Sequence, residues 1–134
     1  MKRGERRPAD LKLKAALESY VASPNTRSRE NLLGLLANST LIFLAEEPKS
    51  GDTKVRLAFT REAEAVVLPA FTDDVALLRW APTGGHTFVA DARGFVPAVL
   101  AGPFEGLSIN PGSSSSVTIH RQELESLAGK PDRA

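Results

Sequence analysis

The sequence predicts one α/β (α+β) domain, a layered sandwich of helices around a mixed sheet. Three observations predict it. Helical and strand patterns alternate along the chain in the order α-α-β-β-β-α-β-α-β-β-α. Two of the early strand patterns are joined by a few polar residues, which adds an antiparallel hairpin to the sheet. The 134 residues, of which 42% are hydrophobic, suit a single domain with its own core.

Two helices are expected first. In the earlier one, apolar residues recur at i, i+3, i+4, i+7 and i+8, which is one stripe of an amphipathic helix. Pro24 ends this helix, since proline disfavours a helical conformation at the preceding residue. Ser28 is the expected N-cap of the second helix. The stripe consists of Leu13, Ala16, Leu17, Tyr20 and Val21, and the second helix carries Leu32, Leu33, Leu35 and Leu36.

Three strands follow. Residues 40–45 are branched or aromatic and too few for a typical helix, so they predict a buried strand. Residues 54–60 alternate between polar and apolar, which is typical of a half-exposed strand. A polar turn at 61–64 joins that strand to another at 65–69, and the two form the expected hairpin.

A third helix is expected after this hairpin. Thr72 is its predicted N-cap, and Asp73 and Asp74 stabilise its first turn through the helix dipole. The helix ends before Pro82, and a short strand follows at 87–90.

The remaining elements are short. A small helix is expected within 95–101, where Pro97 is tolerated only in the first turn. Strands at 106–109 and 117–119 flank a polar loop, and a closing helix begins after the second of them. That helix carries Glu123, Leu124, Leu127 and Ala128.

The charge pattern separates the N-terminus from the rest. Residues 1–14 hold six cations and two acids, a local charge of +4, whereas the whole chain sums to +1. Residues 1–8 are expected to be a disordered basic tail. Residues 9–129 are expected to form one domain, made of a helical pair (9–38) and an α/β core (39–129). With no cysteine and no apolar stretch of the ~20 residues that span a membrane, a cytoplasmic location is expected.

Four segments follow one another in the second half of the chain: Leu68-Pro69-Ala70-Phe71-Thr72-Asp73-Asp74, Trp80-Ala81-Pro82, Gly106-Leu107-Ser108-Ile109-Asn110-Pro111-Gly112 and Arg121-Gln122-Glu123-Leu124. In this order they resemble the N-terminal domain of the SseB family, the "enhanced serine sensitivity" proteins. The resemblance covers roughly residues 30–127 and implies an α/β domain, but it assigns no chemistry to any residue. Pro97 departs from the pattern, since an uninterrupted helix is expected there.

No motif in the sequence points to catalysis, a cofactor or a metal. His86 and His120 are the only histidines, and neither has a second ligand at helical spacing. There is no G-x-S-x-G elbow and no glycine-rich phosphate loop. The Asp73–Asp74 pair already has a structural role at a helix start. The sequence therefore favours a non-enzymatic domain without a cofactor.

Six residues form a candidate patch for a partner or ligand. They come from the start and the end of the third helix and from the asparagine-proline turn, which are expected to share one edge of the domain. The alternative, which the sequence favours for Trp80, is a core position. The six residues are Phe71, Thr72, Trp80, Pro82, Asn110 and Pro111.

The preferred hypothesis is an interaction or regulatory module that binds a protein partner. A small-molecule domain, binding or modifying a compound related to amino acids, is the second hypothesis. Nucleic-acid contact through residues 1–14 is weaker, because the folded body lacks a basic stripe. No membrane contact is expected, and the sequence leaves a homodimer open.

Overall fold

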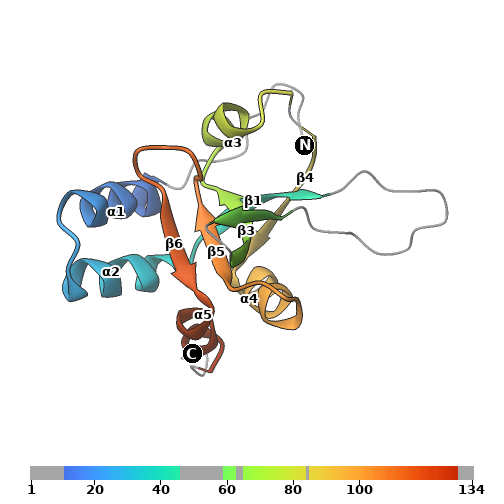
Figure 1. The fold of residues 1–134 in the computed structure, drawn as a ribbon. Coiled ribbons are helices and arrows are strands. Elements are labelled where there is room, and N and C mark those ends of the chain that lie inside the picture. Colours follow the sequence, from blue (N-terminus) through green and yellow to red (C-terminus); the bar gives the residue numbers. More distant parts are fainter. Residues whose placement is uncertain (1–10, 46–58, 63–64, 84, 130–134) are drawn as a thin grey trace.

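The computed structural model of the chain describes residues 11–45, 59–62, 65–83 and 85–129 (Figure 1). Within these residues, helices and strands follow one another in the predicted order. The helices are α1 (Leu11–Ala22), α2 (Thr26–Leu36), α3 (Asp74–Trp80), α4 (Ala92–Ala101) and α5 (Arg121–Gly129). The strands are β1 (Thr40–Ala45), β2 (Thr60–Glu62), β3 (Ala65–Phe71), β4 (His86–Asp91), β5 (Gly106–Ile109) and β6 (Val117–His120).

The strands form one mixed sheet, as predicted. Its order is β4-β1-β3-β5-β6, and β2 pairs with β3 beside this path. The β3–β5 pair is parallel, whereas β1–β3, β1–β4, β2–β3 and β5–β6 are antiparallel. The parallel pair requires a long crossover, which α3, β4 and α4 supply between Phe71 and Gly106.

The hairpin is present, but its turn is shorter than predicted. Arg61 and Glu62 belong to β2 and not to the turn, because Glu62 pairs with Ala65 and Arg61 with Val66. The pairing of Glu62 with Ala65 leaves two residues between the strands, the commonest length of a hairpin connection. Most of the strand predicted at 54–60 lies outside the described residues, and Thr60 begins β2.

Helices cover the two faces of the sheet unequally. The main apolar cluster joins one face to α1, α2, α4 and α5, whereas a small second cluster joins the other face to α3. Alternate residues of β1 point to opposite faces of the sheet. Leu41 and Phe43 lie in the main cluster, and Ile42 and Leu44 lie in the second. Figure 1 places α3 at the end of the molecule away from α5.

Two predicted N-caps are wrong by a few residues. Asn25 caps α2, and Ser28 is its third helical residue; the two residues form a reciprocal capping box. Asp73, not Thr72, caps α3 through its hydrogen bond from the N–H of Ala76. In both helices more than one residue could serve as a cap, and the backbone path of the preceding loop decides which one does.

The fourth helix is longer than predicted. Asp91 caps it by accepting from the N–H of Gly94, so α4 starts at Ala92. Pro97 therefore lies in the second turn and not the first. The proline is tolerated because it faces solvent, while Phe95 and Val99 anchor the opposite side in the main cluster.

In the part of the chain that the structure describes, no helix has the length and apolar character needed to cross a membrane.

Candidate functional site

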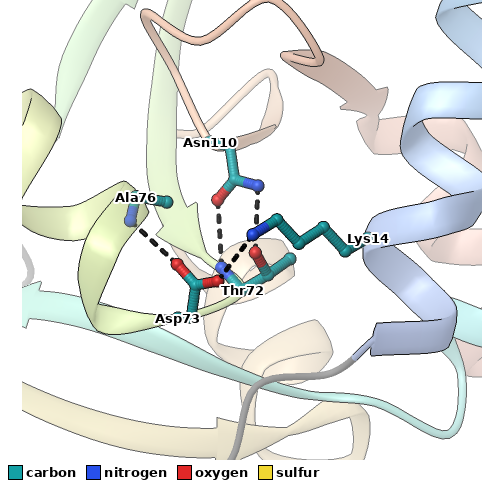
Figure 2. Close-up of polar contacts among 5 residues, drawn as sticks. All are labelled: Lys14, Thr72, Asp73, Ala76 and Asn110. Atoms are coloured by element: carbon teal, nitrogen blue, oxygen red, sulfur yellow. Dashed lines mark hydrogen bonds and ion pairs between the residues drawn. The ribbon is translucent and has the colours of Figure 1, made fainter.

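The carboxyl ends of the parallel strands β3 and β5 meet at a polar junction, which we call the Asn110 junction. It consists of Lys14, Thr72, Asp73 and Asn110 (Figure 2). In open sheets, ligands bind near the carboxyl ends of parallel strands, so this edge is a natural place to look for a site.

Asn110 holds the two strand ends together. Its side-chain oxygen accepts from the N–H of Thr72 at 3.0 Å, and its amide nitrogen donates to Thr72 Oγ1 at 3.0 Å. Its own N–H donates to the carbonyl of Ala70 at 2.7 Å. Asn110 has φ 52°, a left-handed conformation that asparagine tolerates better than most residues. These bonds extend the β3–β5 ladder past its last regular pair.

Asp73 links the junction to two helices. Its carboxylate accepts from the N–H of Ala76 at 2.8 Å and from Lys14 Nζ of α1 at 3.0 Å (Figure 2). Burial acts to raise the pKa of Asp73, but the N–H of Ala76 and the Lys14 ammonium outweigh it, and the pKa is lowered. Asp73 is therefore an ionised cap at neutral pH.

The structure brings most of the predicted patch residues together but buries them. Four of them, Phe71, Thr72, Asn110 and Pro111, are buried. Trp80 is half-buried: its ring lies 5.7 Å from that of Phe71 and packs on the second cluster.

Pro82 is exposed just after α3, and Gly112 lies so close to Trp80 that an added Cβ would sit 3.3 Å from its ring. Of the six predicted residues, only Pro82 and part of Trp80 are thus available at the surface.

A groove of about 780 Å³ lies elsewhere, between α2, α4 and α5. Sequence reasoning missed it, because no pattern in the chain shows that these three helices are neighbours. The only local signal is Gly34, a glycine among the leucines of α2. The groove is lined by Glu30, Leu33, Gly34, Ala37, Asn38, Ala92, Arg93, Val96, Pro97, Glu123, Ser126, Leu127 and Ala128.

The groove has an apolar lining with a few charged groups. Three ionisable side chains line it: Glu30, Arg93 and Glu123. The carboxylate of Glu123 accepts two hydrogen bonds from the Arg29 guanidinium, at 2.8 and 2.5 Å. The bonds from Arg29 lower the pKa of Glu123 against the opposing effect of burial, and those to Glu123 raise the pKa of Arg29. Arg29 also donates to the carbonyl of Thr118 at 2.7 Å, so it ties α2 to α5 and β6.

One comparison with known proteins assigns the chain to a family. Residues 13–126 match the SseB protein N-terminal domain. The chain belongs to the SseB family. The match includes most of α1 and all of α2, and so extends further toward the N-terminus than the resemblance seen in the sequence. No curated protein and no solved structure matches the chain.

The segments that carry the SseB resemblance have structural roles in this domain. Leu68 to Asp73 form the end of β3 and the cap of α3, and Asn110 closes the junction. Arg121, which opens α5, donates to backbone carbonyls at the end of α4 and just beyond it, a contact that no sequence pattern predicted. The acceptors are Val99, Leu100, Gly102 and Phe104.

The two histidines of the SseB domain lie at opposite edges of the sheet. His86 and His120 are exposed on opposite edge strands, β4 and β6. Within residues 11–45, 59–62, 65–83 and 85–129, no three metal-binding side chains come together.

Proposed function

We propose that this SseB domain is a non-enzymatic interaction module of the cytoplasm, and that it binds a segment of a partner protein in the groove between α2, α4 and α5. The observation that carries the proposal is the groove itself. A concave, mostly apolar lining is typical of binding sites in proteins, because it removes apolar surface of a ligand from water.

The Asn110 junction supports binding less well. Asn110 and Thr72 satisfy each other, and Asp73 is engaged by Ala76 and Lys14. Among the described residues, no buried side-chain polar atom lacks a hydrogen-bond partner. A ligand at the junction would have to break existing bonds before it could form new ones.

Matched variants test the proposal. Leu127→Lys places a charge in the groove, whereas Leu78→Lys places one on the outer face of α3, where Leu78 is 48% exposed. Native lysate is passed over the wild type and both variants, partners are identified by mass spectrometry, and the purified partner is titrated calorimetrically. We expect the wild type and Leu78→Lys to bind one partner stoichiometrically and Leu127→Lys to lose it.

Two outcomes contradict the proposal. If Leu78→Lys loses the partner and Leu127→Lys keeps it, the interface lies at the predicted patch near Trp80. If the wild type retains no stoichiometric partner, the protein-binding function is wrong. Circular dichroism and thermal unfolding of both variants show that a loss of binding is not a loss of folding.

A small-molecule function is the second candidate. The groove volume of about 780 Å³ lies within the range of small-molecule sites. Glu30 and Arg93 line it from α2 and α4 with opposite charges, which suits the ammonium and carboxylate of an amino acid. A thermal-shift screen of amino acids and nucleotides tests this, because binding to the native state raises its apparent stability. Nucleic-acid contact stays a prediction, since residues 1–10 lie outside the described part.

A further inference from the structure

We infer that the groove receives an amphipathic α-helix of the partner, with a small residue packed on Gly34 and a basic residue facing Glu30. This inference rests on the proposed function and specifies the class of partner. It is carried by the open space at Gly34, the helical walls of the groove and the exposed Glu30 at its edge.

Gly34 has no packing role within the described chain. A Cβ placed on it would meet no described atom within 4 Å beyond its chain neighbours and its own helix backbone. Glycine within a helix is less favourable than alanine, so alanine would fit here and stabilise the domain. A residue that costs stability without a local reason is expected where a partner needs the space. The absent side chain lets another backbone approach α2 closely.

Pro97 is a second departure from helix preferences at the same place. It lies in the second turn of α4, where proline removes a helical hydrogen bond. Both Gly34 and Pro97 line the groove. Two residues that are unfavourable in helices, Gly34 of α2 and Pro97 of α4, thus line one surface. This supports a requirement at that surface other than stability of the fold.

The shape of the groove favours a helix over a strand. Its walls are three helices, whose backbone groups bond within each helix, and strand addition needs an exposed sheet edge. Residues of α2 and the two positions after it line the groove at i, i+3, i+4, i+7 and i+8 from Glu30, so the wall follows the helix axis. For a helix about 10 Å wide, a volume of 780 Å³ corresponds to roughly two turns.

Beside the Arg29–Glu123 pair, the lining holds one acidic residue, Glu30 on α2, and one basic residue, Arg93 on α4, and Glu30 favours a basic residue on the partner helix. Glu123 is neutralised by Arg29, whereas Glu30 is exposed and has no ion-pair partner among the described residues. A lysine or arginine of the bound helix can pair with Glu30 at the edge of the groove, which fixes orientation more than affinity.

Selection from a random peptide library tests the inference. The peptides are about 15 residues long, which allows four helical turns, and the full chain is the bait. We expect enriched peptides to carry apolar residues at i, i+3 or i+4 and i+7, a glycine, alanine or serine among them, and a flanking lysine or arginine. Circular dichroism should show that they become helical on binding.

Variants of the bait then locate the contact. Gly34→Ala should weaken the selected peptides about tenfold and Gly34→Leu about a hundredfold, because each fills space that the helix occupies. Gly94→Ala is the matched control, since Gly94 is also helical but does not line the groove. It should leave affinity unchanged. Glu30→Lys should weaken lysine-bearing peptides and strengthen their glutamate versions.

The outcomes separate this inference from the proposed function. Extended or proline-rich binders that Gly34→Leu abolishes would overturn the helix and keep the groove. Binders that tolerate both Gly34→Leu and Leu127→Lys would overturn both, because binding then lies elsewhere. A selection that enriches no peptide overturns the helix, while the partner capture still tests the groove. Unchanged far-ultraviolet spectra of the variants exclude unfolding as the cause.

Discussion

At the residue scale, Asn110 determines how two parallel strands end. Its side-chain oxygen accepts a hydrogen bond from the N–H of Thr72, which would otherwise be unpaired. Its positive φ turns the chain away from β5. Both properties belong to asparagine, since few other residues combine an acceptor, a donor and tolerance of the left-handed region.

Replacing Asn110 should separate these two contributions. Asn110→Ala leaves the buried N–H of Thr72 unpaired and keeps an unfavourable φ, so we expect a loss of about 3 kcal/mol in the free energy of unfolding. Asn110→Gly loses the same bonds but tolerates the φ, so it should cost about 1 kcal/mol less. Urea denaturation measures both. Equal stability of the two variants would show that the backbone strain is negligible.

Glu123 should contribute to acid sensitivity. Its pKa is lowered in the folded state from the ordinary 4.5, so its stabilising effect is present above about pH 4.5 and is lost as pH falls through the lowered value. Glu123→Gln should reduce stability at pH 7 by about 1–2 kcal/mol. It should also flatten the decline of stability as pH falls below about 4.5 without abolishing it, since Asp73 still titrates.

Urea titrations at several pH values measure this effect. Glu125→Gln is the control on the same helix, because Glu125 is 57% exposed and lies 3.7 Å from Arg121. An acid profile of Glu123→Gln that matches the wild type would mean that the Arg29–Glu123 pair contributes no net stability.

At the element scale, the close approach of β5 and β6 depends on Gly106. A Cβ on this residue would lie 2.3 Å from the carbonyl oxygen of Ile119, a backbone atom that cannot move without breaking the β5–β6 ladder. Gly106→Ala should therefore cost about 3 kcal/mol or more. Gly34→Ala is the opposite case and should gain about 0.4–1 kcal/mol.

Thermal and urea unfolding of the two glycine variants give a direct comparison. A Gly106→Ala variant as stable as the wild type would indicate that β6 can shift away from β5, and that the pairing is less constrained than the structure implies.

At the scale of the whole molecule, the N-terminal helical pair is part of the main core and not an appendage. Leu13, Leu17, Leu32 and Leu36 are each 0% exposed and belong to the cluster that covers the sheet. Burial of a leucine contributes roughly 1.5–3 kcal/mol, so these four contribute about as much as the whole net stability of a typical domain.

Deletion of residues 1–38 should therefore prevent cooperative folding of the remainder. We expect the shortened chain to lose its near-ultraviolet circular dichroism and its calorimetric unfolding peak, since the sheet would expose its main face. A fragment that keeps a sharp transition would show that the helical pair is a separate unit, contrary to the single domain predicted for 9–129.

Local patterns in the sequence determined the kind and order of the elements. The strands predicted at 40–45 and 106–109 have the predicted bounds, because apolar runs between polar or turn residues depend on neighbours along the chain. The predicted helix starts that were wrong are those near Ser28, Thr72 and Pro97. At each, several residues can act as the N-cap, and the tertiary path of the chain selects one of them.

For the site, the sequence determined less. It predicted a patch around Phe71, Trp80 and Asn110; in the structure the rings of Phe71 and Trp80 lie 5.7 Å apart, and Asn110 accepts from the N–H of Thr72. Only the tertiary structure decided that most of the patch is buried and that a groove exists between α2, α4 and α5. Burial and concavity depend on which segments, far apart in the chain, pack against each other. Local periodicity contains no information about such contacts.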